Sequence, residues 1–134
     1  MTFTATVWNT ANDKAGFAAT YKRFVLADFA EQQFTKSFYR RLSMMFGHIA
    51  HYDRDGFYNT WFTTTVDKLA FVQHALREWY PGDPAWTWSD VEDDLRRWLV
   101  ESNIEAKYTV QLEQETESDE RAQLARLTAK YTNS

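Results

Sequence analysis

The chain has 134 residues, of which 44% are hydrophobic and 25% are charged, and its net charge is −4. A chain of this length buries about two-thirds of the surface that its unfolded form exposes, so we expect a single globular domain over residues 1–134. The absence of cysteine excludes a disulfide framework, a cysteine-ligated zinc site and a cysteine nucleophile. No apolar run reaches the roughly 18 residues that cross a bilayer. The N-terminus also lacks the basic start and apolar block of a signal peptide, so we expect a cytoplasmic protein.

The N-terminal part of the chain is predicted to hold one strand and one long helix. Residues 2–8 alternate their side chains between two sides and include β-branched residues, a pattern typical of a short strand. Residues 9–13 are turn-like and can cap a helix. Over residues 14–33 most apolar positions follow helical spacing, so we expect a helix there, although Gly16 weakens its start.

Two further helices are predicted in the middle of the chain. Apolar residues over 35–52 recur at i, i+4, i+7, i+8 and i+11, the spacing of one buried helix face. Residues 53–56 break this helix, and residues 57–62 form a short aromatic link that is helical or irregular. A second helix follows over 63–79 and ends at 80–84, because two prolines and a glycine in five residues cannot continue it.

Two helices are also predicted near the C-terminus. Ser89 and Glu92 have the spacing of a capping box, which predicts a helix from this point to about residue 102. Residues 118–131 form the last predicted helix, and its apolar residues fall on one face. These residues are Leu124, Leu127 and Tyr131.

The predicted fold class depends on a second strand. Residues 105–112 alternate between apolar and polar side chains, and the segment 3–8 is their only obvious partner. We therefore expect a mainly α fold with a small β element (α+β), in the form of a compact bundle of about five helices and a two-stranded antiparallel sheet.

The negative charge is concentrated in one stretch. Residues 101–120 hold seven acidic residues and one lysine, whereas residues 121–134 hold three basic residues and no acid. If the stretch is extended, Glu113, Glu115 and Glu117 lie on one face and concentrate the field. The favoured interpretation is that these acidic residues form a solvated face of the protein. The alternative is an acidic surface that binds a basic partner.

A possible metal site lies at the end of the second predicted helix. His48, His51 and Asp53 form an H-x-x-H-x-D pattern, and two histidines three residues apart project to the same side of a helix. A metal-dependent hydrolase is therefore one alternative function. The H-E-x-x-H motif is absent, and His51 lies where histidines commonly contact terminal carbonyls, so structural roles are favoured and no cofactor is expected.

Aromatic residues are abundant, with ten phenylalanines, seven tyrosines and six tryptophans. Tyr58, Trp61, Trp86 and Trp88 lie at helix ends or in loops, where side chains are often exposed. Tyrosine and tryptophan anchor interfaces, so we treat these four as interaction candidates together with Glu113, Glu115 and Glu117. The alternative is that the rings fold back against the core.

Direct binding of nucleic acid is not expected. It would require the three adjacent basic pairs, at 22–23, 40–41 and 96–97, to converge on one groove. Because the chain is acidic overall, basic residues on the outer faces of separate helices are the simpler interpretation.

Three short segments, 47–52, 56–58 and 82–86, resemble small proteins of bacteria, phages and plasmids. The resemblance brings no activity with it and implies that such a compact acidic protein acts by binding a host protein, including defence machinery. We expect a non-catalytic protein-binding module. In its narrowest form it is a phage or mobile-element inhibitor, anti-CRISPR-like, that masks a basic nucleic-acid-binding surface. The metal-dependent hydrolase and a self-associating structural protein are the alternatives.

Overall fold

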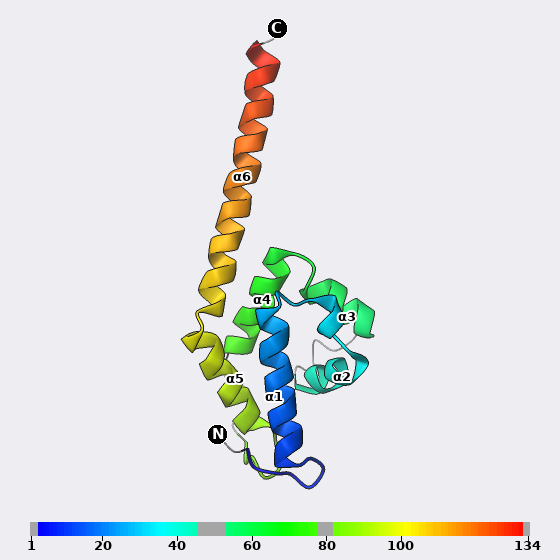
Figure 1. The fold of residues 1–134 in the computed structure, drawn as a ribbon. Coiled ribbons are helices and arrows are strands. Elements are labelled where there is room, and N and C mark those ends of the chain that lie inside the picture. The colour runs from blue at the N-terminus through cyan, green and yellow to red at the C-terminus, as the bar shows by residue number, and fades with distance from the viewer. Residues whose placement is uncertain (1–2, 46–52, 78–81, 133–134) are drawn as a thin grey trace.

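The computed structural model describes residues 3–45, 53–77 and 82–132. Within these ranges all regular elements are helices (Figure 1). In chain order they are α1 (Ala11–Leu26), the 3₁₀ helix η1 (Glu31–Gln33), α2 (Lys36–Met45), α3 (Arg54–Trp61), α4 (Thr65–Leu76), α5 (Ser89–Glu101) and α6 (Ile104–Thr132). The predicted α+β fold of about five helices and a two-stranded sheet is therefore wrong for the described part of the chain, which has six α-helices and no strand.

The first predicted strand is a loop. Phe3 is buried, but Val7 and Trp8 are 69% and 75% exposed, so the alternation does not mark a buried face. The backbone N–H of Thr4 donates to Asp90 in α5 at 2.9 Å, which ties the loop to a helix instead of to a strand. The segment has no strand partner, because the residues expected to pair with it belong to α6.

The second predicted strand is the beginning of α6. Ile104 and Tyr108 are buried and Leu112 is half-buried, and these three residues are spaced by four, as on one face of a helix. Val110, which the alternation placed on the buried side, is 49% exposed. Tyr108 and Leu112 are four residues apart, so they fall on the same side both in a strand, with a period of two, and in a helix, with a period of 3.6. A short apolar pattern therefore could not distinguish the two structures.

Helix α1 begins and ends earlier than predicted. It starts with a capping box, because the Asp13 N–H donates to the Thr10 hydroxyl at 3.0 Å and the Thr10 N–H donates to the Asp13 carboxylate at 2.8 Å. It ends at Leu26, and two consecutive left-handed residues, Asp28 (φ 56°) and Phe29 (φ 57°), follow its C-cap Ala27. This turn places the Phe29 ring in the core, fully buried.

The middle helices lie close to their predicted places, but α3 includes residues 54–56, which were predicted to break the helix, and α4 ends at Leu76, before the predicted end at residue 79. Thr35 precedes α2, and its hydroxyl accepts the Phe38 N–H at 3.1 Å. The aromatic link predicted at 57–62 is helical up to Trp61, because it belongs to α3, which is capped by Asp53. Thr64 caps α4 through the N–H of Asp67.

Helix α5 lies where it was predicted, but its predicted capping box is wrong. Ser89 is the first helical residue rather than the cap, and its hydroxyl donates to the Gly82 carbonyl at 2.7 Å. The helix ends at Glu101, and Asn103, with a φ of 52°, turns the chain into α6. None of the helices in the described ranges combines the length and the apolar character needed to cross a membrane.

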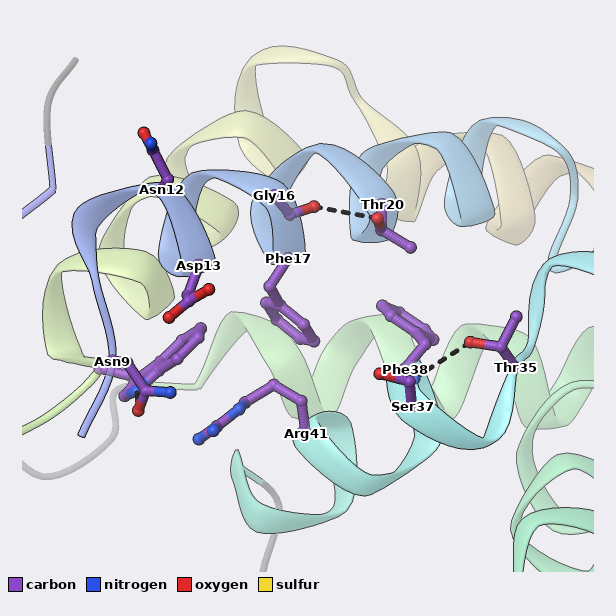
Figure 2. Close-up of a pocket in the computed structure, with 11 residues that line it drawn as sticks. Asn9, Asn12, Asp13, Gly16, Phe17, Thr20, Thr35, Ser37, Phe38 and Arg41 are labelled. Carbon is purple, nitrogen blue, oxygen red and sulfur yellow. Dashed lines mark hydrogen bonds between the residues drawn. The ribbon is translucent and has the colours of Figure 1, made fainter.

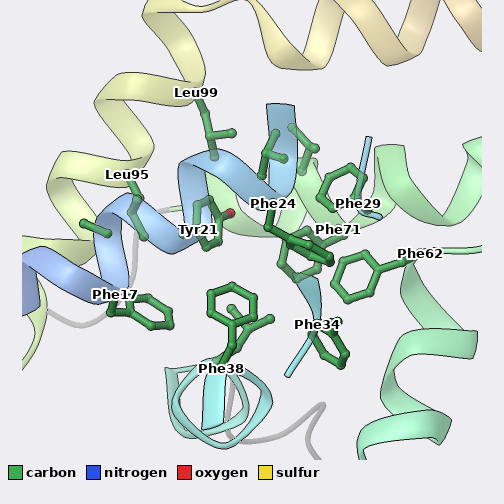
Figure 3. Packing of buried hydrophobic residues seen from close by; sticks show 14 of the residues in the cluster. Phe17, Tyr21, Phe24, Phe29, Phe34, Phe38, Phe62, Phe71, Leu95 and Leu99 are labelled. Atoms are coloured by element: carbon green, nitrogen blue, oxygen red, sulfur yellow. The ribbon is translucent and has the colours of Figure 1, made fainter. Parts of the chain in front are cut away.

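The core is built largely from aromatic rings (Figure 3). At its centre, Phe24 lies 5.0–5.4 Å, centroid to centroid, from Phe29, Phe34, Phe38 and Phe62. Such pairs each add about 0.5–1.5 kcal/mol beyond the area they bury. Helix α1 contacts both α2 and α5, and α4 contacts both α3 and α6. The last helix extends well beyond this body (Figure 1).

Candidate functional site

Of the three predicted metal ligands, only Asp53 lies among the described residues. His48 and His51 lie outside the described residues. The Asp53 carboxylate caps α3 and accepts the Gly56 N–H at 2.7 Å. In the described ranges no three histidine, aspartate or glutamate side chains are grouped so that they could hold a metal ion. The metal site therefore stays a prediction.

Two of the four aromatic candidates belong to the core. Tyr58 is buried, and its hydroxyl donates to the Phe29 carbonyl at 2.7 Å, which stabilises the left-handed turn after α1. Trp61 is half-buried and packs against Phe71 and, nearly parallel, against His74. Neither ring presents the exposed surface that a docking site requires.

The other two candidates lie in the loop before α5. Trp86 is 61% exposed. Trp88 is half-buried, and its indole N–H donates to the Asn9 side chain at 3.2 Å. The guanidinium carbon of Arg41 lies 4.2 Å from the centroid of the Trp88 ring, a close cation–π contact. Trp88 therefore forms a boundary between the loop, α1 and α2.

Lys14 fixes this loop and was missed by the sequence analysis. Its side chain is fully buried, and its ammonium group donates to the Pro84 carbonyl (2.9 Å), the Thr87 carbonyl (2.8 Å) and the Asp90 carboxylate (2.9 Å). All three ammonium protons are thus used. The available signal was that Lys14 shares the buried face of α1 with the apolar residue Tyr21, seven positions later.

The acidic residues at the start of α5 form ion pairs. Besides Asp90, Asp94 pairs with Lys22 at 3.0 Å and Asp93 pairs with Arg96 at 3.3 Å. Burial raises the pKa of Glu92, and the neighbouring Arg96 only partly opposes this. Carboxylates paired in this way serve structure.

A groove lies between the N-terminal half of α1 and α2 (Figure 2). Its volume is about 510 Å³. Its lining includes Asn9, Asp13, Gly16, Phe17, Phe38, Arg41 and Trp88, and we call it the Arg41 groove. Burial lowers the pKa of Arg41, and the charge of Asp13 partly opposes this effect. No local pattern in the sequence marks this groove, because its walls come from segments far apart in the chain.

The second surface is the free part of α6. Every residue from 113 to 132 is exposed, and this part of the helix projects away from the body (Figure 1). Glu115 braces its base, because the carboxylate accepts the Thr65 hydroxyl at 2.7 Å. The three predicted acidic residues are therefore not on one face, since Glu113 and Glu117 lie away from Glu115 on a helix.

An outward seam runs along this part of α6, on roughly the side opposite to the buried Ile104 and Tyr108. Its members follow one another at spacings of four, three, four, three and four, the pattern of a coiled-coil contact. They are Glu113, Glu117, Glu120, Leu124, Leu127 and Tyr131. We call this set the α6 seam. Its first half is acidic and its second half is apolar, with Leu124, Leu127 and Tyr131 exposed by 64%, 44% and 72%.

Comparison with protein-family models, with curated proteins and with solved structures gives no match to this chain. Function is therefore inferred from the geometry and charge of the α6 seam and the Arg41 groove.

Proposed function

We propose that the chain is a non-catalytic protein-binding module that contacts its partner through the α6 seam. The observation that carries the proposal is the exposure of Leu124, Leu127 and Tyr131 on a helix whose residues 113–132 are all exposed. A single helix of about 20 residues is marginal in water, and burying a seam of large apolar side chains in a partner would stabilise it.

The composition of the seam indicates the chemistry of the partner. A partner helix or groove that matches it presents apolar side chains opposite Leu124 and Leu127, and lysine or arginine opposite Glu117 and Glu120. The apolar half supplies most of the affinity, whereas the acidic half sets orientation and association rate. The partner is therefore a basic protein with a helical or grooved apolar contact site.

A second copy of this chain matches the seam less well. Parallel pairing in register sets Glu113, Glu117 and Glu120 against the same residues of the other copy, which is unfavourable. Antiparallel pairing along the full segment sets these acids against leucine and tyrosine. Self-association is thus the weaker candidate, and a different chain is favoured.

The narrower form of the proposal is a phage or mobile-element inhibitor that masks a basic nucleic-acid-binding surface. Residues 113–120 carry five carboxylates. On a helix that rises 1.5 Å per residue they amount to about one negative charge per 2.4 Å. Duplex DNA carries one per roughly 1.7 Å of its axis, so the two charge densities are similar. A groove that binds a phosphate backbone would attract this segment.

The test compares two doubly substituted chains of equal charge. Leu124→Asp with Leu127→Asp disrupts the seam, whereas Ala122→Asp with Ala129→Asp places the same charges on the other side of α6. A photo-crosslinking residue in place of Tyr131 identifies the partner in cell lysate, and its binding is then measured with purified components. We expect the seam variant to weaken binding by at least about 100-fold, or about 2.7 kcal/mol, and the control to bind like the wild type.

Salt dependence tests the acidic half. Binding should weaken as salt rises, and Glu117→Lys with Glu120→Lys should weaken it further while reducing the salt dependence. Equal binding by the seam variant and the control would overturn the proposal. Sedimentation of the isolated chain addresses the weaker candidate, since dimers that the seam variant abolishes would favour self-association.

A further inference from the structure

Arg41 is a half-buried cation whose donors are not used by the described part of the chain. Its guanidinium carbon lies over the Trp88 ring, 4.2 Å from the ring centroid, and no described residue accepts a hydrogen bond from Arg41 or forms an ion pair with it. Arg54 and Arg96 are also partly buried, and both contact carboxylates. Contact with an aromatic face restrains the guanidinium, so its N–H groups are available to an acceptor other than the described residues.

Gly16 leaves room for such an acceptor. It lies within α1, where glycine costs about 1 kcal/mol relative to alanine. A Cβ at this position would meet no atom of the described neighbours within 4 Å, so packing within the chain does not require glycine here. Because Gly16 lines the Arg41 groove, its missing side chain lets a ligand approach the helix backbone.

The two ends of the groove differ in character (Figure 2). The Arg41 guanidinium, Asn9 and Asp13 gather at one end, and the Phe17 and Phe38 rings, 5.3 Å apart and nearly parallel, form the wall beyond them. A groove of about 510 Å³ lies within the usual range for small-molecule sites, about 300–1,000 Å³. It therefore suits a ligand with one polar end and an apolar body.

The charges select the polar end of the ligand. Arg41 is opposed by Asp13, whose own carboxylate is held by the Thr10 N–H. One guanidinium beside one carboxylate favours a singly charged anion over a phosphate dianion, and the planar fork of arginine matches a carboxylate. We propose that the Arg41 groove binds a small organic monocarboxylate, with its carboxylate on Arg41 and its apolar body against Phe17, Phe38 and Trp88.

This inference is independent of the α6 seam. The groove lies beside the N-terminal half of α1, at the end of the body opposite to the free end of α6 (Figure 1). Either surface can fail its test without affecting the other. Substitutions in the groove should therefore leave partner binding through the seam unchanged.

The test is an NMR titration of the full chain with 3-phenylpropanoate, with the neutral 3-phenylpropanamide as the matched probe. We expect saturable shifts at the amides of residues 12–20 and 35–41 and at the Trp88 indole, and weaker binding of the amide. Arg41→Gln should weaken carboxylate binding by about tenfold or more, since it removes a charge-assisted pair. Arg40→Gln, at the adjacent exposed position, is the control and should bind like the wild type.

A second variant blocks the space instead of the charge. Gly16→Leu directs a side chain into open volume and improves helix propensity, so the chain should fold and lose the binding. The proposal is overturned if the amide binds as tightly as the carboxylate, if Arg41→Gln binds like Arg40→Gln, or if no saturable shift appears at millimolar probe.

Discussion

Lys14 shows how one buried charge can organise a loop. Its ammonium group holds two carbonyls and Asp90 in place, and the side chain has no contact with water. Because removing one partner of a buried pair leaves the other charge uncompensated, Lys14→Met should lower the free energy of unfolding by about 3 kcal/mol. Urea denaturation followed by circular dichroism measures this loss.

The control for this substitution is Lys36→Met, at an exposed position at the start of α2. We expect it to change stability by no more than about 0.5 kcal/mol. Equal effects of the two substitutions would mean that the buried ammonium group does not hold the loop.

Asp28 links the left-handed turn to α6 and makes stability depend on pH. Partial burial raises its pKa, but the hydrogen bond from Tyr108 at 2.7 Å and the charge of Lys68 outweigh this, so the pKa lies below its ordinary value of 3.8. A carboxylate with a lowered folded-state pKa contributes stability above its unfolded pKa and loses it as the pH falls through the folded value. The wild type should therefore lose this contribution below about pH 4.

Asp28→Asn isolates that contribution. Asparagine tolerates the left-handed φ of 56° and its amide oxygen can still accept from Tyr108, so the fold should persist. The free energy of unfolding, measured between pH 2 and pH 6, should fall less steeply than in the wild type. Tyr108→Phe should cost about 1 kcal/mol at pH 7 and also flatten the profile. Identical profiles in wild type and Asp28→Asn would contradict this account.

At the scale of the elements, α1 contains a position at which stability can be gained. Gly16→Ala should raise the free energy of unfolding by about 1 kcal/mol, because the added methyl group meets nothing and helix propensity improves. Gly82→Ala should do the opposite, since its Cβ would lie 2.8 Å from the Thr87 hydroxyl, which is already bonded to Asp83 and Ser89. Thermal unfolding of both variants checks the contrast in sign.

Helix positions could largely be predicted from the sequence because local signals determine them. Thr35 and Thr64 cap helices at the beginning of the predicted segments 35–52 and 63–79, and the apolar spacing of α2 and α4 continues from those caps. The strand predicted at 105–112 was wrong because the apolar pattern is short, and the spacing of Tyr108 and Leu112 fits a helix as well as a strand. The end of α1 was missed because a phenylalanine in a left-handed conformation is stabilised only by contacts distant in the chain, including the Tyr58 hydroxyl.

Of the two candidate sites, the α6 seam could be predicted in part from the sequence, whereas the Arg41 groove could not. The common face of Leu124, Leu127 and Tyr131 was predicted from spacing within one helix. Its acidic continuation was missed because Glu113 and Glu117 were considered in an extended stretch instead of in the helix. The Arg41 groove could not be predicted, since Arg41 meets Trp88 only through packing between segments 47 positions apart in the chain.

At the scale of the whole molecule, the body and the free part of α6 should be thermodynamically separate. Among the described residues, Glu115 is the last in α6 with a side-chain hydrogen bond to the body. A chain that ends at residue 116 should therefore unfold within about 2 °C of the full chain, because additive, non-contacting parts do not share stability. Circular dichroism should show the loss of helix, and thermal unfolding the unchanged midpoint. A large drop in the midpoint would mean that residues 117–134 stabilise the body.

The same brace determines where the far tip of the long helix points. From the corner at Asn103 to Thr132 the helix measures about 43 Å at 1.5 Å per residue, and only its first turns and the Thr65–Glu115 bond fix its angle. A rotation of about 10° at this corner moves the tip by roughly 7 Å, about twice the length of a hydrogen bond. The Thr65 hydroxyl on α4 thus helps to fix the direction of α6. Thr65→Val should widen the range of angles between α6 and the body, and so the range of positions of the tip, although no atom at the tip is changed.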